Sequence, residues 1–276
     1  MGCLWNAALQ LAEAPAAILE FAKDQRLPLP RYDTQSARHR ALIPQHENQS
    51  ITPHREAGTF LYLIAKATSP GQDEEMKITV LGLGNVGSQL ARLWTAKGHM
   101  VTAGLREASK AAKTAKELGI TVSDPAVAVK QADVIALALP WQAVEATLAT
   151  LGPLDGRVLL DATNPLAADL SVLVPEESSG AEQIAQWARR ARVVKAFNTI
   201  GAVLFGDSDF DMLYCGDDEE AKDAVRALIE DTTMSPVDAG PLRNARYLEQ
   251  IAGLWIDLAV KGRIPGAFGF RLVRKT

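Results

Sequence analysis

The chain has little cysteine and no excess of basic charge. Only two of its 276 residues are cysteines, Cys3 and Cys215, and neither stands in a C-x-x-C pair. This scarcity argues against a disulfide framework or a zinc site, so we expect no bound metal and a reducing, cytoplasmic compartment. The formal net charge is −4, whereas a nucleic-acid-binding domain usually carries a basic face. We therefore expect no nucleic-acid partner.

Long apolar runs are also missing. No stretch reaches the ~20 residues of a membrane-spanning helix, and the N-terminus lacks the basic segment of a secretory signal. The start Met1-Gly2-Cys3 is similar to an acylation signal, but Asn6 stands where the myristoylation pattern needs Ser or Thr. We expect no membrane partner.

The composition changes near residue 75. Residues 31–56 are polar and without periodicity, and residues 69–75 have the composition of a linker. We predict that residues 1–75 form a poorly ordered extension, with a small helical module docked on the main domain as the alternative. A Rossmann domain is predicted over 76–205. A small region over 206–276 would complete the acceptor site and could form a dimer interface.

After Met76, short apolar runs alternate with segments of helical periodicity. This alternation predicts an α/β fold with a doubly wound parallel sheet of the Rossmann type, followed by a small C-terminal α+β or helical region. The predicted strands are Ile78–Leu81, Met100–Ala103, Val134–Leu139, Val158–Leu160, Val193–Phe197, Met212–Cys215 and, at an edge, Ser235–Asp238. The predicted helices are one containing Val86, Leu90 and Leu93, then Glu107–Leu118, Trp141–Leu151, Glu219–Ile229 and Arg243–Val260.

The first predicted strand runs directly into Gly82-Leu83-Gly84-Asn85-Val86-Gly87, a GxGxxG string. In a βαβ unit Gly82 would permit the tight turn, Gly84 would let the backbone approach a pyrophosphate, and Gly87 would let the helix pack close to the strand. The free N–H groups of the helix N-terminus would face the phosphates. The alternative is a glycine-rich turn without a ligand.

The segment after the second predicted strand, Gly104-Leu105-Arg106-Glu107, indicates which nucleotide binds. NAD sites usually place an acid at the strand end to bind the ribose, and none stands there. A guanidinium at Arg106 suits the 2′-phosphate of NADP, and we expect both Arg106 and Lys110 in the first turn of the next helix, where an anion would favour their charge. The alternative is NAD, with Glu107 on the ribose and Arg106 solvated.

Ligands of doubly wound sheets bind outside the carboxyl ends of the strands. The later strand ends there carry Leu139 and Pro140, then Asn164, then Asn198 with Thr199. The amide and hydroxyl groups could bind a carboxamide or a ring edge, or they could simply form turns. Trp141 could stack on a ring or pack in the core.

An acid or base for catalysis is not evident at these strand ends. His99 precedes the second strand at its amino end, and Asp133 and Lys195 flank strands as structural residues would. Reduction of a carbonyl needs a proton donor, but hydride transfer to a flavin or deazaflavin does not, because solvent can complete the protonation. We therefore assign no catalytic residue and favour a flavin-like acceptor.

Several blocks resemble the NADPH-dependent reductases of the deazaflavin coenzyme F420. They are residues 77–87, 104–106, 139–141, 193–198, 215–218 and 236–242, in that order, and they are also similar to the cytosolic NADPH domain of transmembrane metalloreductases. The resemblance spans roughly residues 76–262. It departs from the archaeal enzymes where Leu105 replaces Ser and where Asn198 replaces His.

The resemblance implies hydride transfer between NADPH and a deazaflavin or flavin, in a homodimer. It places the pyrophosphate on residues 82–87, the 2′-phosphate on Arg106, and the nicotinamide and acceptor rings against residues 139–140 and 196–198. With the motif analysis, the expected cofactor-binding residues are Gly82, Leu83, Gly84, Asn85, Val86, Gly87, Leu105, Arg106, Lys110, Leu139, Pro140, Asn164, Ala196, Phe197 and Asn198.

Two other functions remain open from the sequence. One is an NADP-dependent reductase of a small imine or carbonyl, and the other is a non-catalytic NADP-binding or sensing protein. The last predicted helix has an apolar stripe that could pack on its own domain or on a second subunit. The stripe consists of Leu248, Ile251, Trp255, Leu258 and Ala259.

Overall fold

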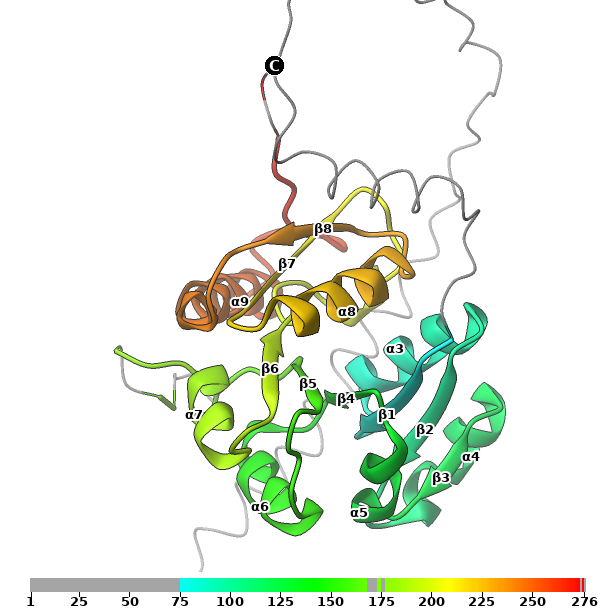
Figure 1. Cartoon of the computed structure of the whole chain (residues 1–276). Coiled ribbons are helices and arrows are strands. Elements are labelled where there is room, and N and C mark those ends of the chain that lie inside the picture. The colour runs from blue at the N-terminus through cyan, green and yellow to red at the C-terminus, as the bar shows by residue number, and fades with distance from the viewer. Residues whose placement is uncertain (1–74, 168–172, 175–176, 274, 276) are drawn as a thin grey trace, which may run out of the picture. The chain divides into compact units, whose positions relative to one another are not determined.

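The computed structural model describes residues 75–276 except 168–172, 175–176, 274 and 276 (Figure 1). The chain divides into two units, Met1–Glu74 and Glu75–Thr276. The sheet, its helices and the candidate site all belong to the second unit. The predictions made for residues 1–74 lie outside the described residues.

Eight strands form the sheet of this unit, in the order β3-β2-β1-β4-β5-β6-β7-β8. Neighbours from β3 to β6 are parallel, β7 is antiparallel to β6, and β8 is parallel to β7. The strands are β1 (Lys77–Leu81), β2 (Met100–Gly104), β3 (Thr121–Ser123), β4 (Val134–Leu137), β5 (Val158–Asp161), β6 (Arg192–Lys195), β7 (Asp211–Gly216) and β8 (Ser235–Asp238). The prediction of a mostly parallel, doubly wound sheet is confirmed, with β8 at its edge.

Helices cover both faces of the sheet because β1, β4 and β5 are apolar on both sides. One core contains Val80 and Leu160 with residues of α3 and α8, and the other contains Ile135 and Leu159 with residues of α6, α7 and α9. The α-helices are α3 (Asn85–Ala96), α4 (Ala108–Leu118), α5 (Pro125–Ala128), α6 (Trp141–Leu151), α7 (Gly180–Trp187), α8 (Glu219–Glu230) and α9 (Ala245–Val260). The 3-10 helices are η1 (Val129–Gln131), η2 (Ala202–Leu204) and η3 (Leu242–Asn244).

One strand and two α-helices, besides the 3-10 helices, were missing from the sequence-based prediction. β3 has three residues and no buried one, so it shows no apolar run. The four-residue α5 starts where the Asp124 side chain accepts a hydrogen bond from the N–H of Ala126. Ser179 caps α7 in the same way, by accepting from the N–H of Glu182. The two short helices begin at capping residues, which a search for periodicity alone does not detect.

Two strands end earlier than predicted. β4 ends at Leu137 and β6 at Lys195, so Leu139 and Phe197 belong to the connections that follow these strands. Phe197 has φ of 60°, in the left-handed region, which removes it from any strand. The apolar runs continue past both strand ends because the connections are themselves buried or half-buried.

The final helix packs on its own unit along part of the predicted stripe. Leu248 is buried, and Trp255 donates from its ring nitrogen to the carbonyl of Phe268 at 2.7 Å. Tyr247, Leu254 and Val260 are exposed. The described part of the chain contains no helix long and apolar enough to span a membrane.

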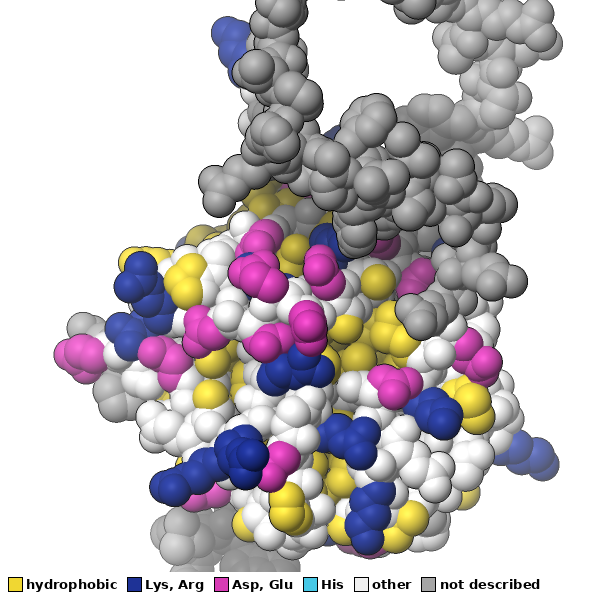
Figure 2. All heavy atoms as spheres, viewed as in Figure 1, with side chains coloured by type: hydrophobic (Ala, Val, Ile, Leu, Met, Phe, Trp, Pro, Cys, Tyr) yellow, Lys and Arg dark blue, Asp and Glu magenta, His cyan; other side chains and the backbone are white. Residues whose placement is uncertain are grey.

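Acidic side chains gather over α8 on the face drawn in Figure 2. The helix carries Glu219 and Glu220 in its first turn, and its cap, Asp218, accepts from the N–H of Ala221 at 2.8 Å. Carboxylates at a helix N-terminus are favoured by the helix dipole. These acids therefore have a local structural role.

Candidate functional site

The connection from β1 to α3 contains the GxGxxG string, and two of its glycines meet backbone. Gly82 has φ of +99°, and a Cβ there would lie 2.5 Å from the carbonyl oxygen of Ala138. A Cβ on Gly87 would lie 1.9 Å from the carbonyl oxygen of Gly82. These two glycines hold the turn tight and bring α3 against the start of the β4–α6 connection.

The third glycine, Gly84, faces open space. A Cβ built there meets nothing within 4 Å, and both Gly84 and Asn85 are exposed. Gly84 is also the N-cap residue of α3, which has no side-chain cap and no acidic residue in its first turn. The N–H groups and the positive dipole end of a twelve-residue helix are thus left to an anion. The residues present fit the pyrophosphate of a dinucleotide. Leu83 and Val86 beside them are half-buried.

Arg106 lies just before α4, not in its first turn as predicted. Glu107 is the N-cap residue, and of the two predicted cations only Lys110 lies in the helix. The backbone of Leu105 is held by the carbonyl of Ser123 at 3.0 Å, whereas the side chain of Arg106 is exposed. Within the described ranges no carboxylate forms an ion pair with Arg106, so its guanidinium is available to a phosphate.

The connection from β4 to α6 follows the carboxyl end of β4, the strand beside β1. Leu139 is half-buried, and Pro140 is exposed as the residue before the first turn of α6. The Trp141 ring lies 5.3 Å from that of Trp187, centroid to centroid, and close to Gly180. Of its two interpretations, the structure shows packing against α7.

Two asparagines join the carboxyl ends of the neighbouring strands β5 and β6. The Asn164 amide nitrogen donates to the backbone carbonyl of Asn198 at 3.2 Å. The Asn198 amide nitrogen in turn donates to the side-chain oxygen of Asn164 at 3.1 Å. We call this pair the asparagine clasp. It brings two of the predicted binding residues together from positions 34 residues apart in the chain.

The residues before Asn198 contribute backbone rather than side chains to this end of the sheet. Ala196 and Phe197 are fully buried, and the Phe197 ring packs edge-on against Trp94 and Phe205. The N–H of Phe197 donates to the sulfur of Met212 at 3.1 Å. The left-handed backbone of Phe197 is a costly conformation that the surrounding core maintains. This conformation turns the chain away from the direction of β6 just before Asn198.

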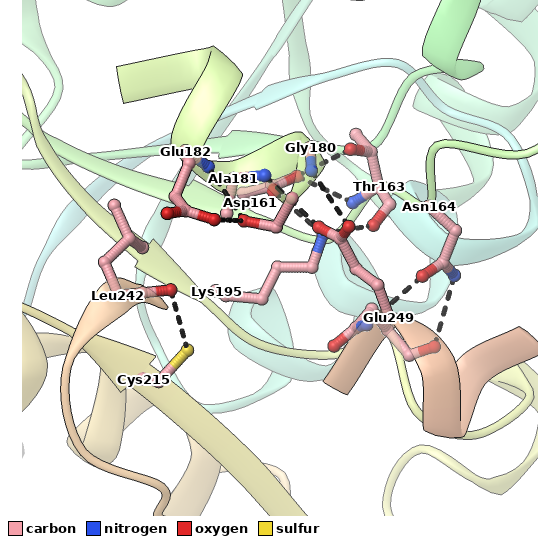
Figure 3. A network of polar contacts seen from close by, with 12 residues as sticks. Asp161, Thr163, Asn164, Gly180, Ala181, Glu182, Lys195, Cys215, Leu242 and Glu249 are labelled. Carbon is pink, nitrogen blue, oxygen red and sulfur yellow. Dashed lines mark hydrogen bonds and ion pairs between the residues drawn. The ribbon is translucent and has the colours of Figure 1, made fainter. Parts of the chain in front are cut away.

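Below the clasp lies a buried ionic network, drawn in Figure 3, which converges on Lys195. The ammonium of Lys195 contacts carboxylate oxygens of Asp161 and Glu249, each at 2.9 Å, and donates to the carbonyl of Thr163 at 2.5 Å. Asp161 also accepts from the N–H and the hydroxyl of Thr163 at 2.8 and 2.7 Å. The network therefore fixes the backbone of the segment that leads into Asn164.

Glu249 connects this network to α7 as well. Its carboxylate accepts from the N–H groups of Gly180 and Ala181 at 2.9 and 3.2 Å, at the N-terminus of α7. The sequence analysis missed Glu249. The available signal was its position on the buried face of α9, since Ala245 and Ala252 lie at helical spacing on either side and are fully buried.

The pKa of Lys195 reflects this environment. Burial by itself lowers the pKa of an ammonium, but the carboxylates of Asp161 and Glu249 outweigh it, and the pKa of Lys195 lies above its ordinary value. Lys195 therefore stays charged and is a structural cation. The sequence-based interpretation of Lys195 as structural fits these contacts.

Two other reactive side chains are also tied into the fold. His99 is buried, accepts from the N–H of Met76 at 3.1 Å and lies 2.9 Å from a carboxylate oxygen of Asp231, at the amino end of β2. Burial raises the pKa of the Cys215 thiol to about 12, so this thiol is no nucleophile. In the part of the chain that the structure describes, no three His, Cys, Asp or Glu residues are grouped to hold a metal.

Comparison with known proteins relates this chain to NADP oxidoreductases. The family described as NADP oxidoreductase, coenzyme F420-dependent, matches residues 77–165. The F420-dependent NADP reductase of Methanothermobacter marburgensis is 34% identical over 220 residues, which cover 71% of this chain and 98% of that protein. The metalloreductase STEAP3 of Rattus norvegicus is 30% identical over 183 residues, 64% of this chain and 36% of that one.

Solved structures agree with this relationship. A protein from Arthrobacter sp. FB24, described as a candidate F420-dependent NADP reductase, superposes with a TM-score of 0.67 at 28% identity. The match covers 72% of this chain and all of that one. A reductive aminase of Aspergillus terreus in complex with NADPH and ethyl levulinate reaches 0.54 at 24% identity, covering 68% of this chain and 63% of the aminase. At that identity the likeness is one of fold.

Proposed function

This chain belongs to the coenzyme F420-dependent NADP oxidoreductase family, and we propose that it transfers hydride between NADPH and a deazaflavin or flavin acceptor. The observation that carries the proposal is the β1–α3 turn. Its exposed Gly84 faces open space at the uncapped N-terminus of α3, where a pyrophosphate fits.

The remaining parts of the nucleotide would lie along the carboxyl ends of the other strands. Arg106 and Lys110, after β2, would bind the 2′-phosphate. The strand order reverses between β1 and β4, and a dinucleotide crosses the crevice at that point. The nicotinamide would then lie over the ends of β4, β5 and β6, beside Leu139, Pro140 and the asparagine clasp.

The bound NADPH would supply a hydride, and the acceptor ring would take it together with one proton from solvent. The residues that would line this end of the crevice are Leu139, Pro140, Asn164, Asn198 and Thr199, and none of them titrates near neutral pH. They can orient two rings and exclude water, but they offer no strong general acid for a carbonyl or imine. This favours a flavin-like acceptor over the small-substrate alternative.

The preference for NADP is tested first by the variant Arg106→Ala. Removal of a charge-assisted contact to the 2′-phosphate should weaken NADPH binding roughly 10- to 100-fold and leave NADH binding unchanged. Fluorescence titration of both nucleotides measures this. The matched control is Arg92→Ala, which removes an exposed arginine from α3. Equal affinities of the wild type for NADPH and NADH would contradict the role of Arg106.

The acceptor is tested by turnover of NADPH with coenzyme F420 and, separately, with free flavin mononucleotide. Oxidation of NADPH that depends on one of these acceptors supports the proposal. Oxidation only with an imine or carbonyl would favour the small-substrate reductase. Tight binding of NADPH without any turnover would favour the nucleotide-sensing protein.

A further inference from the structure

Phe197 combines a costly backbone conformation with a buried ring. Its φ is 60°, in the left-handed region that a bulky aromatic residue rarely adopts, and its side chain is only 1% exposed. A strained residue of this kind persists only where its surroundings stabilise it, and such residues cluster at functional sites. The contacts of Phe197 therefore determine the path of the chain that follows it, beginning at Asn198.

Phe197 is held both by its N–H group and by its ring. The N–H donates to the sulfur of Met212 at 3.1 Å. The ring meets those of Trp94 and Phe205 edge-on, with centroids 5.9 and 5.4 Å apart. Edge-on ring pairs stabilise a fold beyond the area that they bury. Met212 and Phe205 lie a little further along the same stretch of chain, whereas Trp94 belongs to α3.

The Trp94 ring is fixed in one orientation. The residue is fully buried, and its indole nitrogen donates to the carbonyl of Leu228 in α8 at 3.0 Å. The ring cannot turn away from Phe197 without losing this bond and leaving a buried donor without a partner. Trp94 is therefore a rigid support, placed between α8 and the left-handed residue.

The helix that carries Trp94 is the one whose N-terminus we propose binds the pyrophosphate. Gly87, in its first turn, lies against the Gly82 carbonyl, and Trp94 follows about two turns later on the buried face. The same helix also lies against the chain after Phe197, because a Cβ on Gly206 would lie 3.3 Å from a methyl carbon of Leu93. One helix thus touches both ends of the candidate site.

We propose that Trp94 is a positioning residue for the ring end of the site, which acts by holding Phe197 in its left-handed conformation. The inference rests on the proposed function, because it takes the rings to lie against the segment that begins at Asn198. Without the indole, Phe197 would relax toward an ordinary extended backbone, and this segment would be displaced. The pyrophosphate end depends on the glycine turn and would keep its geometry. Loss of Trp94 should therefore weaken binding of the rings and spare binding of the phosphates.

Two ligands report separately on the two ends. NADPH engages both ends, whereas adenosine 2′,5′-bisphosphate carries the adenine and two phosphates but no nicotinamide. Calorimetric titration of the full chain gives the ratio of the two affinities for each variant. The wild type should bind NADPH more tightly than the bisphosphate.

Substitutions of Trp94 test the support directly. Trp94→Leu should bind NADPH about tenfold more weakly and the bisphosphate as the wild type does, because the conformation that receives the rings becomes a minor one. Trp94→Phe keeps an aromatic ring beside Phe197 and should restore most of the affinity for NADPH. The matched control is Leu148→Ala, which removes a buried side chain from the core on the other face of the sheet. It should lower the thermal midpoint without changing the ratio.

A pair of substitutions at Phe197 separates backbone conformation from packing. Phe197→Gly and Phe197→Val both remove the ring, but glycine adopts the left-handed conformation freely and the β-branched valine resists it. Phe197→Gly should therefore keep more of the preference for NADPH than Phe197→Val. Packing alone predicts the opposite order, because valine fills more of the cavity. If Phe197→Gly does not fold, the Trp94 series decides the matter by itself.

The outcomes distinguish this inference from the function on which it rests. An unchanged ratio in Trp94→Leu, no recovery in Trp94→Phe, or a ratio that simply follows the thermal midpoint through all variants overturns the role of Trp94. A wild type that binds both ligands equally shows that the rings add no affinity and also overturns it. A wild type that binds neither ligand overturns the proposed function itself.

Discussion

The two ends of the candidate site, one after β1 and β2 and the other after β5 and β6, are built in different ways. At the β1–β2 end, backbone dominates: two glycines are pressed against carbonyl oxygens, and the helix N-terminus is left bare. At the β5–β6 end, side chains dominate: Lys195, Asp161 and Glu249 form a buried network that supports the asparagine clasp. The first end is specified within a few adjacent residues, and the second needs residues from three separate segments.

Because of this difference, the two ends should be sensitive to different kinds of substitution. A backbone site fails when a side chain is added, because there is no room for new atoms. A site made of buried charges fails when a side chain is removed, because a partner remains buried without compensation. We therefore expect the β1–β2 end to be damaged by substitutions that add atoms and the β5–β6 end by substitutions that remove them.

The largest effect is expected for Gly87→Ala. Its Cβ would stand 1.9 Å from a backbone oxygen, which cannot move without opening the turn, so we expect no stably folded protein. Gly84→Ala is the matched variant, since its Cβ meets nothing within 4 Å. It should keep the thermal midpoint of the wild type but lose most NADPH affinity. Circular dichroism melts and nucleotide titration separate the two outcomes, and equal behaviour of both variants would refute the distinction.

The next effect is expected for Lys195→Met at the other end. Two carboxylates would remain buried without their cation, which should cost about 3–5 kcal/mol in the free energy of unfolding. The control is Lys222→Met, whose side chain is 8% exposed but whose partners Glu219 and Asp238 reach solvent. It should cost less than about 1 kcal/mol. Urea denaturation measures both, and similar losses would mean that burial of the carboxylates is unimportant.

The two ends of the candidate site also differ in how much of them the sequence could predict. The glycine string and the residues that follow each strand could be found from the sequence, because each lies within a few residues of a strand, although β4 and β6 end earlier than predicted. Glu249 was not, since its partners Gly180 and Ala181 are 69 and 68 residues away and no local pattern links them. The left-handed turn at Phe197 was equally hidden, because a buried aromatic residue after an apolar strand favours continued strand.

The smallest effect concerns a half-buried ion pair between α7 and α9. Glu182 accepts two hydrogen bonds from Arg246, at 2.8 and 2.6 Å, and these bonds lower the pKa of Glu182 below its ordinary value. A lowered pKa means that the pair stabilises the fold above the unfolded-state pKa and loses this contribution as the pH falls through the folded-state pKa. Because the pair is partly exposed, its contribution to the free energy of unfolding should be small.

Glu182→Gln tests this tie by urea midpoints measured at pH 7 and at pH 3.5. The variant should be slightly less stable than the wild type at pH 7, and the difference should be smaller at pH 3.5. A difference that grows toward acid pH would contradict the assigned sign.

Because Glu249 lies late in the chain, the β5–β6 end of the site can be completed only late in synthesis. A growing chain emerges from the ribosome at roughly 5–20 residues per second, so the 69 residues from Gly180 to Glu249 take several seconds to appear. During that interval β5, β6 and the first turn of α7 exist without the carboxylate that caps the helix and completes the contacts of Lys195. The turn between β1 and α3, which we propose binds the pyrophosphate, can close early in synthesis. The end that we propose faces the nicotinamide is completed only when the final helix docks.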